Sequence, residues 1–292
     1  MNWPLHIVDV FAAERYAGNP LAVVFAAEGA LDAATMQRIA LETNYSETTF
    51  VAPQPLADGA WRVRMFTPAR EIAFAGHPIL GTAWAIRRHL APAAQALTLR
   101  LMQDDVHVRF AREADGADVA WFRAPPVTLG RQIDAARVAA ALGLDAADID
   151  PRAPVRQCAA GTAALVVPLA SAAALARARL DLAAFAPLAA EGLAPLTYLV
   201  CREARAPQNQ LRARFFFEAH GVREDPATGN GAAFLGRWLL EHGWLGAGDL
   251  DLRIEQGDDV QRPSLVRLRA HAATREVLVG GQVVATVSGV LV

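Results

Sequence analysis

Residues 224–240 combine an acidic residue, a glycine loop and a helix start in a way that could bind and act on an anion. The segment reads EDPATGNGAAFLGRWLL, and Asp225 stands directly before a proline, which is typical of a turn. Gly229 and Gly231 then lead into a run with the apolar periodicity of a helix. Backbone N–H groups at a helix start have no intrahelical partner and lie at the positive end of the dipole, so they favour anions. Taken alone, the segment is equally typical of an ordinary turn before a capped helix.

The same arrangement occurs a second time, earlier in the chain. Residues 75–86 read AGHPILGTAWAI, in which a glycine and a polar residue again open a helix of small residues. Gly76 and Gly229 are separated by the same number of residues as Leu97 and Leu250, which begin two similar strands. Further matches keep the same order, with 18–24, 31–32, 48–51 and 64–66 lying over 161–167, 180–181, 197–200 and 214–216. These ordered matches predict two halves of one α+β unit.

The two halves differ at two carboxylates. Glu47 in the first half lies over Leu196 in the second, and Asp225 is predicted to lie in a loop with no counterpart in the first half. One carboxylate from each half suits a cleft between the halves. We expect the two helix starts to face each other across this cleft and to hold an anionic substrate, such as a carboxylate, with a proton-transfer group on each side.

Composition excludes several classes of partner. The chain has 292 residues, 53% of them hydrophobic, and a net charge of −2 without a basic run, which argues against nucleic acid and anionic membranes. The N-terminus lacks the pattern of a signal peptide, and no apolar run approaches the length of a membrane span. The two cysteines have no metal-ligand spacing, and no nucleotide-type phosphate loop is present, so we expect a cytoplasmic protein with no metal and no cofactor.

Two local signals predict helices away from these segments. Asp32 is a suitable N-cap for a helix over residues 33–42. The alanine-rich residues 171–190 predict a surface or packing helix.

Several motifs together resemble the phenazine biosynthesis isomerase-like family. They are SETTFV at 46–51, FTPxxE at 66–71 leading into GHP at 76–78, EDPATG at 224–229, and QG at 256–257 ahead of RPS at 262–264. The resemblance covers essentially the whole chain. It implies the diaminopimelate epimerase-like fold, an α+β fold of two pseudo-symmetric domains, each a curved sheet around a central helix. We expect an N-terminal domain of residues 1–127 together with 283–292, and a C-terminal domain of 128–282.

The resemblance implies a cofactor-independent isomerase, similar to trans-2,3-dihydro-3-hydroxyanthranilate isomerase, that moves a proton within a small carboxylate-bearing metabolite. Glu47 matches the family's catalytic glutamate, and His77 and Asp225 match the histidine and aspartate of the pocket. The family also suggests a homodimer. The positions assigned to substrate binding are Asn19, Ser46, Gly76, Gly229 and Asn230.

Some positions depart from the family pattern and leave the substrate open. Asn230 replaces a frequent serine, and Ala75 replaces a frequent cysteine, so the thiol chemistry of related epimerases cannot run there. One alternative is an epimerase or racemase of amino or hydroxy acids, with Glu47 and Asp225 on opposite faces of one carbon. Another is a non-catalytic metabolite-binding protein. On spacing alone, Glu47 could be a surface carboxylate, His77 a packed helix-terminal residue and Asp225 a turn cap.

Overall fold

The computed structural model describes residues 2–217 and 224–292. The chain divides into two compact units. Unit 1 consists of Met1–Arg123 and Gly280–Val292, and unit 2 consists of Ala124–Val279. Within the described residues, no helix is long and apolar enough to cross a membrane.

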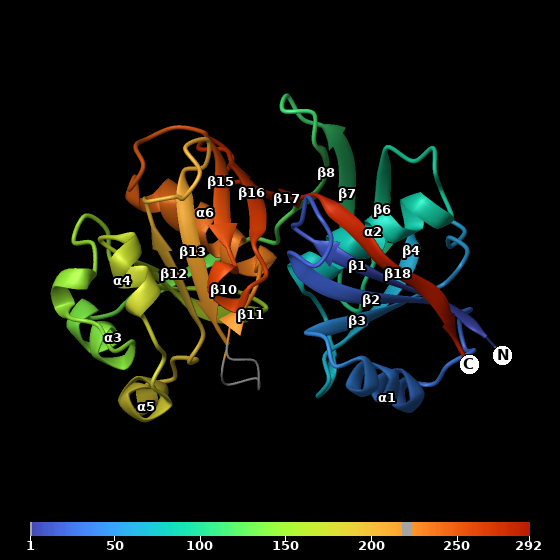
Figure 1. Ribbon diagram of the computed structural model, residues 1–292, viewed down its shortest axis with the longest axis horizontal. Helices are drawn as coiled ribbons and strands as arrows, with labels where there is room; N and C mark the ends of the chain where they lie inside the picture. The colour runs from blue at the N-terminus through green and yellow to red at the C-terminus, as the bar shows by residue number, and fades with distance from the viewer. Residues whose placement is uncertain (1, 218–223) are drawn as a thin grey trace. The chain divides into compact units, whose positions relative to one another are not determined.

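Unit 1 is a mixed sheet whose strands pack around one helix (Figure 1). Its elements are β1 (Trp3–Val10), β2 (Asn19–Phe25), α1 (Ala33–Thr43), β3 (Glu47–Val51), β4 (Trp61–Phe66), β5 (Glu71–Ile72), α2 (Gly76–His89), β6 (Ala96–Arg100), β7 (Asp105–Arg112), β8 (Asp118–Arg123) and β18 (Val283–Leu291). β2 runs parallel to β3, and β4 runs parallel to β6, whereas β1 with β2 and β18, β3 with β4, β4 with β5, β6 with β7 and β7 with β8 pair antiparallel. The C-terminal strand β18 pairs with β1 and so returns the end of the chain to the unit that contains its beginning.

The central helix α2 is buried on almost all of its faces because small residues let the strands come close. At Gly81, an added Cβ would lie 2.6 Å from the Leu21 side chain and 2.8 Å from that of Val10. Close packing of this kind leaves no room for a larger residue. It also fixes the first turn of α2 relative to β1 and β2.

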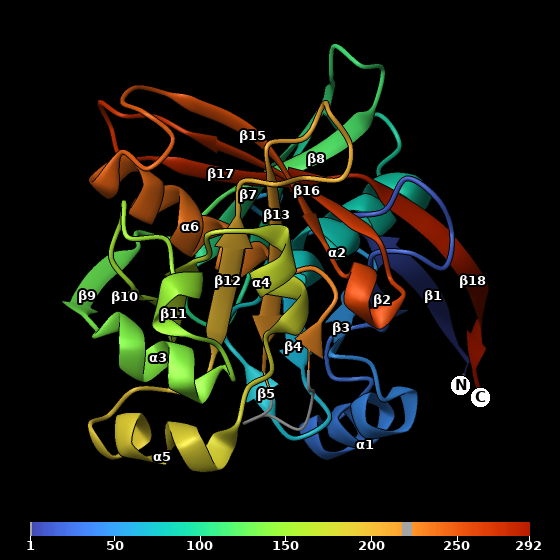
Figure 2. The same ribbon diagram turned by 60° about the vertical axis from the view of Figure 1, so that its left-hand side comes forward.

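Unit 2 repeats this plan (Figure 2). Its elements are β9 (Thr128–Gln132), α3 (Ala135–Ala141), the 3-10 helix η1 (Ala146–Asp148), β10 (Arg156–Ala160), β11 (Thr162–Pro168), α4 (Ala172–Arg177), α5 (Leu182–Ala190), β12 (Thr197–Cys201), β13 (Leu211–Phe216), β14 (Glu224–Asp225), α6 (Gly229–His242), β15 (Leu250–Gln256), the 3-10 helix η3 (Asp258–Val260), β16 (Ser264–Ala270) and β17 (Val277–Gly281), which contains the boundary to unit 1. The central helix α6 packs on β10, β11 and β16. Gly236 allows this approach, since a Cβ there would lie 2.8 Å from Val277 and 3.0 Å from Leu268.

The strand registers show how closely the halves correspond. Thr48 lies opposite Phe66 in the β3–β4 pair, and Thr197 lies opposite Phe216 in the β12–β13 pair. Parallel pairing of β2 with β3 is repeated by β11 with β12, and that of β4 with β6 by β13 with β15. The ordered sequence matches therefore reflect equivalent positions in two similar sheets.

The same registers correct one prediction about Asp225. In the short strand β14, Asp225 lies opposite Phe215, just as Ile72 of β5 lies opposite Met65. The segment from the short strand to the central helix has the same length in both halves. Asp225 therefore does have a counterpart, Ile72, and the prediction of a loop without an equal was wrong. The extra residues of unit 2 precede the short strand, where a comparison of sequences alone could not place them.

Candidate active site

Glu47 is the first residue of β3, a strand buried along its whole length between β2 and β4. β-Branched and aromatic residues dominate this strand, as its position in the sheet requires. The Glu47 side chain is only 12% exposed. Because burying a carboxylate is costly without polar partners, its neighbours decide what it can do.

His77 supplies the nearest ionisable neighbour. It is the second residue of α2, and its Nε2 lies 3.3 Å from Oε2 of Glu47. Two influences oppose each other here, since a carboxylate at this distance favours the imidazolium form and burial favours the neutral ring. Burial is the stronger influence, because the His77 side chain is almost fully enclosed, and it lowers the pKa of His77 from 6.5 to about 3. A hydrogen bond to the backbone of Pro20 acts in the opposite direction and is smaller.

The tautomer of His77 follows from its partners. Proline has no backbone N–H, so the bond to Pro20 runs from a ring N–H of His77 to the Pro20 carbonyl oxygen. Within the described residues, Nε2 makes no aligned hydrogen bond, so the donor to Pro20 is Nδ1. In the neutral ring Nε2 then carries a lone pair directed at the Glu47 side of the site. The Nε2–Oε2 contact becomes strongly attractive when one proton lies between the two atoms, so the pair can store a proton that Glu47 has removed from a substrate.

The remaining predicted positions of unit 1 surround this pair. Asn19 is fully buried at the start of β2, directly before the proline that holds His77. Ser46 is half-buried and precedes Glu47. Gly76 opens α2 and is buried. The structure thus brings Glu47 and His77 together, with Gly76 next to His77 in the chain and Asn19 next to Pro20, the hydrogen-bond partner of His77.

The start of α2 is available for an anion. Its N-cap residue, Ala75, has no side chain that could cap the helix, and its first turn has no acidic residue. Pro78, the third residue, has no N–H. The backbone N–H groups of Gly76 and His77 therefore remain as the donors of this turn.

In unit 2, Asp225 is held by a residue of its own loop. Its Oδ2 accepts a hydrogen bond of 2.6 Å from Oγ1 of Thr228. Thr228 is the N-cap of α6, but its side chain makes no capping bond to the helix. The first residues of α6, Gly229 and Asn230, therefore keep their N–H groups for another acceptor. Asn230 is half-buried, and its Oδ1 has no hydrogen-bond partner among the described residues.

Gln256, at the end of β15, fixes this loop from outside. Its Nε2 donates to the Asp225 carbonyl oxygen at 2.9 Å and contacts Oγ1 of Thr228 at 3.0 Å, while its Oε1 accepts from the Thr228 N–H at 3.2 Å. Gly257 follows with φ 86°, and a Cβ there would lie 2.3 Å from the Arg262 carbonyl oxygen. The motif around Gln256 and Gly257 therefore acts as a clamp on the Asp225 loop. Sequence reasoning missed the roles of Thr228 and Gln256, although the match of Gln256 to Gln103 in the repeated segments was a signal.

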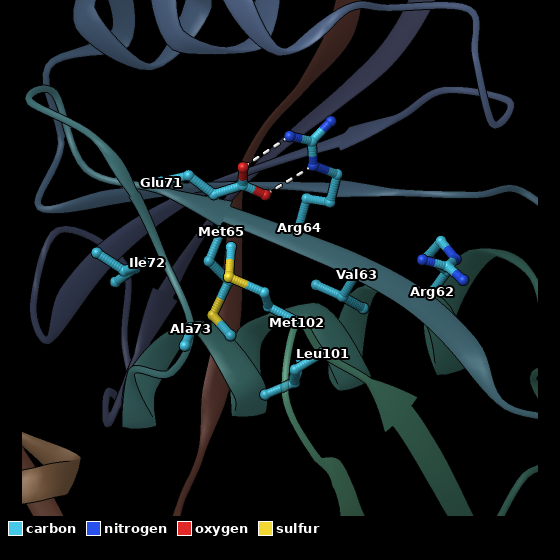
Figure 3. Close-up of a pocket in the computed structure, with 9 residues that line it drawn as sticks. All are labelled: Arg62, Val63, Arg64, Met65, Glu71, Ile72, Ala73, Leu101 and Met102. Atoms are coloured by element: carbon cyan, nitrogen blue, oxygen red, sulfur yellow. Dashed lines mark hydrogen bonds and ion pairs between the residues drawn. The ribbon is translucent and has the colours of Figure 1, made fainter. Parts of the chain in front are cut away.

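A surface hollow in unit 1, with a volume of about 180 Å³, is lined by other residues (Figure 3). Neither Glu47 nor His77 lines it, and its charged pair is satisfied, since Arg64 donates two bonds of 2.7 Å to Glu71. The turn from β6 to β7 is tight here, whereas the connection from β15 to β16 is longer and contains η3. We therefore attribute the hollow to the shorter turn. Its lining residues are Arg62, Val63, Arg64, Met65, Glu71, Ile72, Ala73, Leu101 and Met102.

Comparisons with known proteins agree with the motifs. A family model described as "Phenazine biosynthesis-like protein" matches residues 8–289. An uncharacterized isomerase of Mesorhizobium japonicum is 38% identical over 90% of this chain and 88% of its own length. The trans-2,3-dihydro-3-hydroxyanthranilate isomerase of Pseudomonas aeruginosa is 36% identical over 93% of this chain and 91% of its own.

A solved structure extends this agreement to the fold. The crystal structure of a phenazine biosynthesis protein of the same family from Bacillus anthracis aligns with a TM-score of 0.89 at 23% identity, covering 100% of this chain and 99% of the other. At this identity the likeness concerns the fold alone. It confirms the predicted fold class.

Proposed function

Because the chain belongs to the phenazine biosynthesis-like family and is an isomerase, we propose that it moves a proton between two carbons of a small carboxylate-bearing metabolite without a cofactor. The reaction would be similar to that of trans-2,3-dihydro-3-hydroxyanthranilate isomerase, which is the name of one relative. The observation that carries the proposal is the buried contact of 3.3 Å between Glu47 and His77. A buried carboxylate beside a neutral imidazole is suited to removing and returning a proton.

In the proposed mechanism, Glu47 removes the proton from a substrate carbon. The C–H bond breaks, its electron pair forms a new double bond with the adjacent carbon, and the former double bond takes up a proton at its far end. The protonated Glu47 delivers a proton there, either the one it removed or one exchanged with solvent, so the atoms balance without an oxidant or reductant. His77, held by Pro20 through Nδ1, offers its Nε2 lone pair to the protonated carboxyl and stabilises it between the two steps.

The substrate carboxylate would bind to backbone N–H groups at a helix start. Gly76 and His77 offer them in unit 1, and Gly229 and Asn230 offer them in unit 2. Neither first turn contains an acidic residue that would repel an anion. We propose that Asp225, held by Thr228, serves the same substrate as the second ionisable group.

Proton exchange with solvent tests this proposal. The protein is incubated in deuterated water with trans-2,3-dihydro-3-hydroxyanthranilate and, separately, with other unsaturated carboxylic acids that carry an acidic C–H. Proton NMR is expected to show deuterium entering the substrate and a shifted double bond, both in the presence and in the absence of a chelator. Binding without exchange for every compound would support a metabolite-binding protein instead, and activity that depends on added metal would contradict the cofactor-free mechanism.

A further inference from the structure

Tyr198 of β12 and Asp225 of β14 both lie opposite Phe215 of β13, and Tyr198 has no role in the proposed mechanism. It is the second residue of β12 and is fully buried. Its ring lies against the first turn of α6, where a Cβ added to Gly231 would be 2.4 Å from Cδ2 and 2.6 Å from Cε2 of the tyrosine. The glycine thus creates the space that the ring occupies.

The hydroxyl of Tyr198 is buried without a hydrogen-bond partner among the described residues. Such a group costs stability and calls for an explanation, because nearly all buried polar groups are paired. Burial raises the pKa of Tyr198, and the nearby negative charge of Asp225 raises it further. Tyr198 is therefore a neutral O–H donor, and Asp225 is close enough for its charge to act on the hydroxyl.

Unit 1 shows that the fold does not require a tyrosine here. The strand register places Thr49 at the equivalent position of β3. The Thr49 hydroxyl is satisfied by Thr82 of α2, with 2.8 Å between the two oxygens. In α6 the position of Thr82 is taken by Leu235, which offers no partner to a hydroxyl.

Two more differences accompany this exchange. Pro78 in the first turn of α2 corresponds to Gly231 in α6, which admits the ring of Tyr198. Ile72 corresponds to Asp225. Unit 2, which carries the Asp225 carboxylate, thus also has the longer buried hydroxyl side chain, the space for its ring and no threonine partner for its hydroxyl.

From this coincidence we propose that Tyr198 is a positioning residue for Asp225: the Tyr198 hydroxyl donates a hydrogen bond that reaches the Asp225 carboxylate through one bridging water molecule, while Asp225 serves the substrate. The inference rests on the proposed function for its meaning in catalysis. A hydrogen bond to a carboxylate favours the ionised form, so the tyrosine would make Asp225 release a proton more readily. It would also hold the carboxylate in one orientation together with Thr228.

Charged groups on the neighbouring elements of unit 2 have ion-pair partners of their own. On β13 and β14, Arg214 and Glu224 form a pair with two bonds of 2.9 and 2.7 Å. Asp258 and Asp259 of η3 face Arg212, and Asp259 also faces Arg214. The first turn of α6 carries no acidic residue, and Gln256 of β15 is neutral. On β12, the titratable side chain described as interacting electrostatically with Asp225 is Tyr198.

The first test measures the titration of Asp225 itself. Carboxyl-carbon NMR of protein labelled at aspartate, with the Asp225 signal assigned by its loss in Asp225→Asn, is compared between the wild type and Tyr198→Phe. Removing the donor is expected to move the Asp225 midpoint to higher pH by about 0.5 or more. An unchanged midpoint overturns the inference. This readout does not depend on activity, so it stands even if the proposed isomerase reaction fails.

A matched pair of variants separates positioning from folding. Tyr198→Phe removes the proposed hydrogen bond without leaving a buried hydroxyl unpaired, and it is expected to leave Tm close to that of the wild type, to lower kcat severalfold and to leave KM within about twofold. Thr49→Val removes a satisfied hydroxyl at the equivalent position and is expected to lower Tm with kcat retained. Full kcat in a stable Tyr198→Phe protein would contradict the inference while leaving the proposed function intact.

If Tyr198→Phe fails to fold, fluorination provides the second route. The chain has only three tyrosines, so 3-fluorotyrosine can replace them all during expression. The fluorinated phenol is a stronger donor, and it is expected to move the Asp225 midpoint to lower pH. No movement, or movement to higher pH, would overturn the inference.

Discussion

The neutral form of His77 predicts how the protein responds to acid. Burial lowers the pKa of His77 to about 3 in the folded protein, whereas an unfolded histidine titrates near 6.5. Above pH 6.5 both states hold a neutral ring, and the full stability is present. Between pH 6.5 and about 3 the unfolded state binds the additional proton, so the free energy of unfolding falls as the pH is lowered.

The size of this effect follows from the difference between the two pKa values. Each pH unit within this window costs about 1.4 kcal/mol, so His77 alone removes about 2 kcal/mol between pH 6.5 and pH 5. This is a large share of the stability of an ordinary domain. His77→Gln cannot take up the proton and should lose this part of the pH dependence, whatever its stability at neutral pH.

Urea unfolding of the wild type and His77→Gln at pH 7, 6 and 5 measures the difference. The wild type is expected to lose about 2 kcal/mol more than the variant over this range. Nitrogen-15 spectra of the imidazole provide a second reading and should show a neutral ring with its proton on Nδ1 at pH 6. Equal slopes for the two proteins would mean that His77 titrates alike in the folded and unfolded states, and an imidazolium at pH 6 would mean that Glu47 and His77 form an ion pair. Either result would contradict proton storage by a neutral His77.

Two further substitutions test the packing and the chemistry of unit 2. Gly231→Ala should destabilise the protein by about 1–3 kcal/mol in urea unfolding, because its Cβ would lie 2.4 Å from the Tyr198 ring. Gly289→Ala, whose Cβ would have nothing within 4 Å, should leave the stability unchanged. Equal stability of the two variants would disprove the predicted clash. Asp225→Asn should lower turnover less than loss of Glu47 does if Glu47 alone shuttles the proton, as measured by deuterium exchange into substrate. A loss as large as that of Glu47, together with inversion at one carbon, would favour the epimerase alternative.

Local signals were sufficient for much of the fold. Glycine loops before small-residue runs predicted the two central helices; the first begins at Gly76 as predicted, whereas the second begins at Gly229, within the predicted loop. Asp32 was predicted as an N-cap, and its side chain accepts from the Thr35 N–H at 2.7 Å. These features depend on neighbours within a few residues, so the sequence carries them directly.

Features that depend on distant contacts were harder to predict. The alanine-rich residues 171–190 form two short helices, α4 and α5, instead of one continuous helical region. The break between them is held from outside, because the N–H groups of Arg179 and Asp181 donate to the carbonyl oxygens of Leu142 and Ala141. The side chain of Asp181 then caps α5. Alanine content alone could not reveal this tertiary competition.

In the candidate site, too, local signals could be predicted from the sequence and distant contacts could not. Glu47 and His77 could be proposed from motifs, but their distance and the hydrogen bond to Pro20 depend on how β2, β3 and α2 pack. The clamp that Gln256 places on Asp225 joins residues from different elements, and its sequence separation gave no local signal. Tyr198 was predicted only as part of a strand match, because its role depends on the contact of its ring with α6 and on β13, which pairs with both β12 and β14.

The central claim is that Glu47 carries the substrate proton, and deuterium exchange in Glu47→Gln tests it most directly. Glutamine keeps the shape of the side chain but cannot exchange a proton at a useful rate, and Leu196 at the equivalent position shows that the fold does not need a carboxylate there. We expect Tm and binding of a carboxylate ligand close to those of the wild type, and exchange slowed by about 100-fold or more. Glu28→Gln, at an exposed glutamate, serves as the control and should exchange at the wild-type rate. Wild-type exchange in Glu47→Gln would contradict the claim and, with it, the mechanism built on the Glu47–His77 pair.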